Sequence, residues 1–212
     1  MRSRGDGWWL AGGPLLGSAL GAVDSLVNHV PVWRGEVGLA RAERSGWSQV
    51  AEFASLILDA GWAWAAAAVL AGWLVSAQAR PAVGLLRGAV AGALALVFAT
   101  AAYYGLDVLF DGGAWWSGTT AYWLVGSVVL GPALGAVGAS IRRPGPAGPL
   151  AALAVPVGAA LQMVVLPPAS ESLMAQPVRL TVWVSAAAAT VLIVRAGARG
   201  WAPARPARPD RS

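Results

Sequence analysis

The chain has 212 residues, of which 57% are hydrophobic and only 12% are charged, and its mean hydropathy is +0.61. A water-soluble domain of this size needs more polar surface to cover its core, so the composition excludes an ordinary soluble protein and indicates that lipid is the main solvent. All fifteen basic residues are arginines, and they cluster near predicted helix ends and in the tail, which argues against a nucleic-acid-binding domain.

The first apolar run, residues 8–27, predicts a helix long enough to cross the hydrocarbon core of a bilayer. Within it Gly13, Gly17 and Gly21 recur every four residues, so they share one face along which another helix can approach closely. A basic start followed by an apolar run is also typical of a cleavable signal peptide, and this alternative stays open. The glycine face favours a helix that is retained.

A polar connection, residues 29–49, separates the first run from the second and could hold either a short interfacial helix or a solvated loop. The second predicted helix covers residues 50–77. It contains a twenty-residue stretch, 56–75, whose only charge is Asp59. That stretch alone has the length and composition that a membrane-spanning helix requires.

The remaining apolar runs predict helices at residues 83–109, 119–141, 150–166 and 178–194. Two of these helices carry further glycines at four-residue spacing, which are Gly84, Gly88, Gly92, Gly131 and Gly135. The run 150–166 is barely long enough to span the bilayer and contains Pro156, so a re-entrant segment is the alternative.

These runs predict one all-α domain, residues 1–197, which is a polytopic membrane helix bundle. It has six transmembrane helices, or five if the fifth run is re-entrant or the first is cleaved. Residues 198–212 are rich in Arg, Pro and Ala and are predicted to be a disordered cytoplasmic tail.

The arginines also predict the orientation, because cytoplasmic loops carry an excess of basic residues. With the amino end inside, eleven of the fifteen arginines fall on the inner side. The other four lie on the outer side and are Arg34, Arg41, Arg44 and Arg179. The sequence therefore predicts a multi-pass protein of the cytoplasmic membrane with both termini in the cytoplasm.

Polar side chains gather near the predicted outer ends of the first three helices, and ionisable groups at membrane depth are candidates for function. Within each helix, most of them are spaced by three, four or seven residues and therefore share a face. The candidate binding residues are Asp24, Asn28, Glu52, Ser55, Asp59, Tyr103, Tyr104 and Asp107. A bundle that turned these faces inward would form an outward-facing acidic pocket rimmed by aromatic rings.

Asp59 is expected to be the deepest of these residues, about 10 Å beyond Glu52 along the helix axis. This position suits a proton, a cation or a small cationic solute and predicts a carrier-like binding protein. In the alternative, Asp59 accepts hydrogen bonds from Tyr103, Tyr104 or a backbone group and only fixes the packing of helices. His29, after the predicted end of the first helix, is expected to be a solvated loop residue.

Motifs for catalysis and cofactor binding are missing from the sequence. It has no HExxH, GxSxG, GxGxxG or Walker-type loop, and one histidine without any cysteine cannot build the usual zinc site. An aspartate pair, Asp24 with Asp59 or Asp59 with Asp107, could still support hydrolysis, although no spacing argues for it. We therefore expect a protein that is not an enzyme and binds no cofactor, metal or nucleic acid.

The second functional hypothesis is a non-catalytic structural or partner-binding membrane protein. Its glycine faces would pack against a membrane-protein partner or against a second copy of the chain.

Three segments carry a resemblance to a known family: Leu58–Gly72, the pair Tyr103 and Tyr104, and Gly131–Gly138. Together they resemble a family of small bacterial integral membrane proteins of about this length, in which a polar residue precedes a Trp-containing second helix. In that family the polar position is more often Asn than Asp. The resemblance covers the middle half of the chain and implies a multi-pass membrane protein, but it brings no activity with it.

Overall fold

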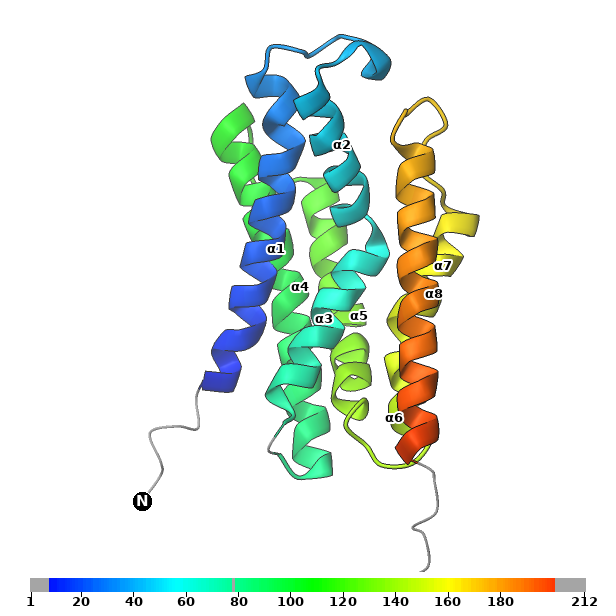
Figure 1. Cartoon of the computed structure of the whole chain (residues 1–212). Coiled ribbons are helices and arrows are strands. Elements are labelled where there is room, and N and C mark those ends of the chain that lie inside the picture. Colours follow the sequence, from blue (N-terminus) through cyan, green and yellow to red (C-terminus); the bar gives the residue numbers. More distant parts are fainter. Residues whose placement is uncertain (1–7, 78, 201–212) are drawn as a thin grey trace, which may run out of the picture.

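The computed structural model describes residues 8–77 and 79–200, and within this part of the chain every regular element is a helix. The longer helices lie side by side along one bundle axis (Figure 1). The elements are α1 (Trp8–Trp33), the short 3-10 helix η1 (Arg41–Glu43), α2 (Gly46–Leu58), α3 (Gly61–Val75), α4 (Pro81–Asp111), α5 (Gly118–Ser140), α6 (Ala147–Ala152), α7 (Ala154–Val165) and α8 (Ala175–Gly200).

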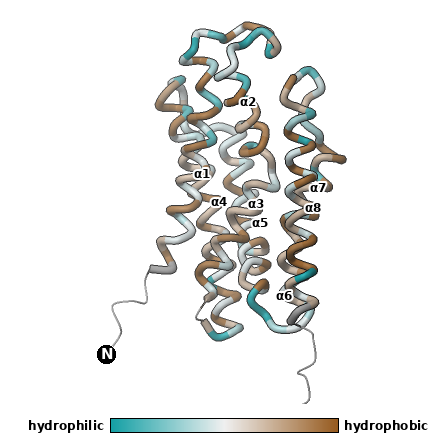
Figure 2. The backbone as a smooth tube through the Cα atoms, viewed as in Figure 1, coloured by the Kyte–Doolittle hydropathy of each residue, from teal (hydrophilic) through white to brown (hydrophobic). Residues whose placement is uncertain are grey.

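Among the described residues, five helical segments are long and apolar enough to cross a membrane, and α2 with α3 would make a sixth. Hydrophilic connections gather at the two ends of the bundle, and more hydrophobic segments lie between them (Figure 2). The start of α1 and the end of α8 lie at the same end of the bundle (Figure 1). This arrangement agrees with the all-helical, multi-pass architecture that the sequence predicts.

The second predicted helix, residues 50–77, is not continuous. α2 ends at Leu58, α3 begins at Gly61, and the two axes are bent by 59° at the break. Asp and Gly are both poor residues for a helix interior, and here they stand two residues apart. The backbone N–H of Trp62, in the first turn of α3, donates to Oε1 of Gln162 in α7 at 2.9 Å. A residue far along the chain thus satisfies one of the donors that a helix start leaves free.

Other helix bounds differ from the predicted ones in ways that matter for the site. α1 continues to Trp33, so it carries His29 within the helix and not in a loop. The fifth apolar run is divided at Leu153, and Pro156 lies in the first turn of α7, where its missing N–H costs little. α8 extends to Gly200; the rest of the predicted tail, like the amino end with its arginines, lies outside the described residues.

Glycines set the spacing of the helices in the main bundle. A Cβ added to Gly13, Gly17 or Gly21 would overlap the backbone of α4. The overlapped residues are, in the same order, Ala91, Ala95 and Ala99. In the same way Gly88, Gly92, Gly131 and Gly135 join α4 to α5, and Gly72 and Gly138 join α3 to α5. Gly84, by contrast, has only ordinary van der Waals neighbours. The predicted glycine faces are therefore occupied largely by helices of the same chain.

A second apolar cluster holds the α7–α8 hairpin. Ala159 and Met163 of α7 pack with Val178 and Val182 of α8, and apolar side chains of α2 and α3 pack against this cluster. The hairpin is thereby attached on the side of the helix break, where Gln162 reaches α3.

We predict opposite effects for two Gly→Ala substitutions. Gly17→Ala should lower the free energy of unfolding by about 1–3 kcal/mol, because the added methyl group pushes α1 away from the backbone of α4. Gly126→Ala in α5 meets no atom within 4 Å and should leave stability unchanged or raise it, because alanine is the better helix former. Thermal unfolding of the detergent-solubilised variants measures both. Equal effects at the two positions would contradict close packing at Gly17.

Candidate functional site

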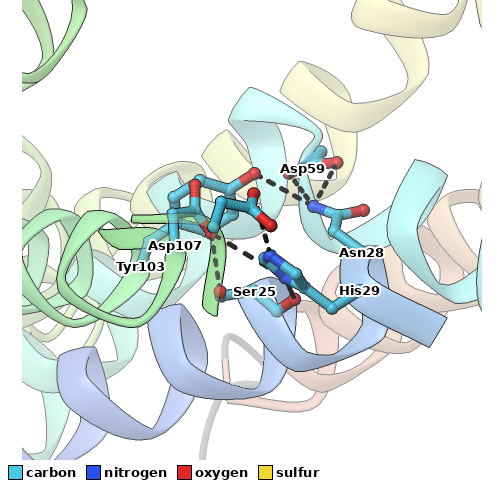
Figure 3. Close-up of polar contacts among 7 residues, drawn as sticks. Ser25, Asn28, His29, Asp59, Tyr103 and Asp107 are labelled. Atoms are coloured by element: carbon cyan, nitrogen blue, oxygen red, sulfur yellow. Dashed lines mark hydrogen bonds and ion pairs between the residues drawn. The ribbon is translucent and has the colours of Figure 1, made fainter. Parts of the chain in front are cut away.

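Polar side chains of α1, α4 and the α2–α3 break meet near the bundle end that carries the α1–α2 connection (Figures 1 and 3). The glycine ladder explains why they meet. The contacts of Gly13, Gly17 and Gly21 advance by four residues along both α1 and α4, so the two helices run parallel and stay in register. One and two turns beyond Gly21, the same face of α1 carries Ser25 and His29 in place of glycine.

Asn28 is the centre of the first group of contacts (Figure 3). Its Nδ2 donates to both carboxylate oxygens of Asp59, at 3.1 and 3.3 Å, and to the hydroxyl oxygen of Tyr103 at 3.0 Å. Ser55 Oγ, one turn before Asp59, donates to the same carboxylate at 3.0 Å. Asp59 therefore accepts hydrogen bonds from an amide and a hydroxyl, and the two tyrosines donate none to it. Among the described residues, no cationic side chain pairs with Asp59.

His29 is the centre of the second group. The residue is only 5% exposed and lies within α1. The prediction of a solvated loop residue is therefore wrong. Nδ1 lies 2.7 Å from the carbonyl oxygen of Ser25, and Nε2 lies 3.2 Å from Oδ2 of Asp111. Ser25 Oγ in turn donates to Oδ1 of Asp107 at 2.7 Å. Because a carbonyl and a carboxylate oxygen both accept, the ring can donate to both only as an imidazolium.

Asp24 is the most enclosed acidic residue of the site. It is 0% exposed, and neither carboxylate oxygen has a hydrogen-bond partner. Asp59 and Asp107 are the charged groups that act on it, and both are acidic. An ionised carboxylate in this position would cost several kcal/mol, since among the described residues no cationic side chain pairs with it. Asp24 is thus the most buried of the predicted site residues, whereas Asp59 is exposed at the helix break.

A cavity of about 350 Å³ leads to Asp59 from the α1–α2 connection. Asn28, Ser55 and Asp59 line one part of it, and the other polar lining residues are Arg41, Arg44 and Glu52. The cavity therefore carries both signs of charge, whereas the sequence predicts an acidic pocket. The difference arises because the connection folds back over α2, where Arg41 Nη1 contacts Glu52 Oε1 at 3.0 Å.

The predicted site residues divide into three groups. Asn28, Ser55, Asp59 and Tyr103 share hydrogen bonds, whereas Asp107 belongs to the separate group around Ser25 and His29. Glu52 lines the cavity but contacts Arg41 and none of the other predicted residues by a hydrogen bond. Tyr104 packs edge-on against the ring of Tyr103, with centroids 5.1 Å apart.

Ser25 and Asp111 are not among the predicted site residues, and His29 was predicted only as a solvated loop residue. A signal for all three is present, because Ser25 and His29 are four residues apart on α1, as are Asp107 and Asp111 on α4. The same spacing rule that selected Asp24 with Asn28 would have selected these pairs. The arginines of the cavity had no such signal, since they lie in an irregular connection.

Comparison of the chain with models of known protein families, with curated proteins and with solved structures finds no match. Among the residues that the structure describes, no three acidic or histidine side chains converge in a way that could hold a metal ion.

We predict that the cavity admits water from the side of the α1–α2 connection. The chain contains no cysteine, so Ser55→Cys introduces a single thiol that lines the cavity. It should react with a membrane-impermeant thiol reagent applied to intact cells, and Leu70→Cys should not, because Leu70 is 42% exposed on the apolar surface of α3. Absence of labelling at position 55 from either side of the membrane would contradict a water-filled cavity. Labelling only in inverted vesicles would reverse the predicted orientation.

Proposed function

We propose that this protein is a carrier-like, multi-pass protein of the cytoplasmic membrane that binds a proton within its cluster of carboxylates. The distribution of arginines supports an orientation with both termini in the cytoplasm and the cavity facing outward. The candidate acceptors are Asp24, Asp59 and Asp107.

One observation carries this proposal: Asp24 is fully buried, and both of its carboxylate oxygens lack a partner. A carboxyl group that only fixed helix packing would be expected to hold hydrogen bonds to its neighbours, as buried polar groups generally do. A bound proton or a small cation would remove the uncompensated charge.

Two chains of polar groups approach Asp24 from the outer end. The first passes from the cavity through Asp59 and Asn28. The second begins at Asp111, whose side chain is 61% exposed, and continues through His29 towards Asp107. The side chains of the second chain can accept and donate protons, so it is a suitable route for proton exchange with water, whereas the amide of Asn28 interrupts the first.

The break between α2 and α3 supports a carrier more than a rigid structural protein. Discontinuous helices in transporters place unwound backbone and free helix ends beside the bound solute. Here Asp59 lies directly at the break, and the bend of 59° separates two helical halves that could tilt independently.

The alternative, a protein that binds a partner through its glycine faces, has less support. The close contacts at Gly13, Gly17 and Gly21 are made with α4, and those of Gly131 and Gly135 with α4 as well. These faces are already filled, so a partner or a second copy would have to use another surface.

We predict that Asp24 exchanges a proton on titration. Infrared spectra of the protein in liposomes, recorded as a function of pH, should contain a band of a protonated carboxyl group that Asp24→Asn removes. Because asparagine has nearly the same size and carries no charge, this variant should fold. Glu171→Gln, at an exposed position in the α7–α8 connection, is the matched control and should retain the band. If the spectra of Asp24→Asn and the unmodified protein are identical at every pH, the proposal is wrong.

A further inference from the structure

The cavity beside α2 contains two side chains of opposite charge that have no ion-pair partner among the described residues. Four charged side chains line it, and two of them, Arg41 and Glu52, form an ion pair with each other at 3.0 Å. The other two are Arg44 and Asp59. Among the described residues neither forms an ion pair, either with the other or with a third group.

The environment of Arg44 indicates an unused donor. Its Nε is inaccessible to solvent and has no hydrogen-bond partner, although its backbone carbonyl accepts from the side chain of Gln49. A solute cannot reach the covered Nε, but Arg44 lines the cavity, so the terminal N–H groups of the same guanidinium can bind an anionic group there. Guanidinium groups bind carboxylates and phosphates especially well, because their donors match the spacing of two anionic oxygens.

The environment of Asp59 indicates that its carboxylate lacks a cationic partner. Asn28 and Ser55 orient its carboxylate by hydrogen bonds but bring no charge to it. Carboxylate oxygens have about four acceptor positions, so these donors leave room for a further one. An ammonium group is the partner that would neutralise the carboxylate.

The two groups lie at opposite ends of α2, because Arg44 precedes the helix and Asp59 follows it. Fifteen residues of helical rise would separate them by about 22 Å at the backbone, and the long arginine side chain shortens this distance without closing it. The ion pair of Arg41 and Glu52 lines the same cavity and is internally neutral. A ligand that reached both free charges would therefore be elongated, with its own charges at its two ends.

We propose that this cavity binds an elongated zwitterion, with an anionic carboxylate at Arg44 and a primary ammonium at Asp59. The proposal rests on the proposed function in one respect, since it names the solute class of the same carrier site. It differs in the residues that carry it, because Asp24 takes no part in recognising the solute.

The experiment uses a ladder of ω-amino acids that differ only in the distance between ammonium and carboxylate. Glycine, aminobutanoate, aminohexanoate and aminooctanoate are added to the purified full-length protein, and binding is measured by calorimetry and by thermal stabilisation. Pentylamine and hexanoate are the single-charge fragments that match aminohexanoate. Arg44→Gln and Asp59→Asn remove one charge each, and Arg34→Gln, in the same connection with a 52% exposed side chain, is the control.

We expect the longer zwitterions to bind at least tenfold more tightly than glycine and than either single-charge fragment. Arg44→Gln should remove this advantage and leave the weak binding of pentylamine unchanged. Asp59→Asn should also remove it and leave the weak binding of hexanoate unchanged. Arg34→Gln should bind as the unmodified protein does. Aminohexanoate should also slow the thiol labelling of Ser55→Cys, which reports occupancy of this cavity directly.

Other outcomes would overturn the inference and can be told apart from a failure of the proposed function. If pentylamine binds as well as aminohexanoate and Arg44→Gln has no effect, the site recognises cations alone; the zwitterion is then excluded while the proton site stands. If no ligand in the ladder binds or protects Ser55→Cys, the cavity does not take this class of solute. The infrared test of Asp24 is independent of both results.

Discussion

The close approach of α1 to α4 is the constraint on which the rest of the structure depends. It requires glycine at three positions of α1 that are four residues apart, because any side chain there would overlap the backbone of α4. Helix association in lipid gains little from hydrophobicity and depends on such close packing. The same spacing continues into the polar end of the bundle, where it brings Ser25 to Asp107 and His29 to Asp111 within hydrogen-bond distance. A wider separation of the two helices would break both contacts.

The second determinant is the break after Leu58. A continuous helix over this segment would have placed Asp59 on one helical face, beside Ser55 and Glu52. The bend of 59° instead leaves Asp59 at a corner, where it faces Asn28 and also lines the outer cavity. Gln162 of α7 makes this corner favourable by accepting a hydrogen bond from the first turn of α3. The α7–α8 hairpin thus supports the site without contributing a charged residue to it.

Charge compensation is incomplete in both parts of the site, and this is the physical basis of the functional proposals. Several charged groups near the α1–α2 connection are paired: Arg41 contacts Glu52, and Glu36 lies near Arg34 and accepts from the backbone of Ser45. Asp24 is buried without a partner, and Arg44 and Asp59 lack opposite charges. Uncompensated groups in such positions are costly, so they are more easily explained by a bound species than by stability.

The sequence by itself determined the all-helical architecture, the approximate positions of the apolar runs and the end of the bundle at which polar residues gather. These features follow from composition and from spacing along single helices, which need no knowledge of neighbours. The tertiary structure alone decided the helix break at Asp59, the burial of Asp24 and His29, and the entry of Arg41 and Arg44 into the cavity. Each of these depends on which segment lies opposite. Gln162 and Asp111 lie far along the chain from the residues that they contact. Arg41 and Arg44 lie in or beside an irregular connection, outside any periodic pattern. The polar groups and their helical spacing were therefore visible in the sequence, whereas their contacts between helices were not.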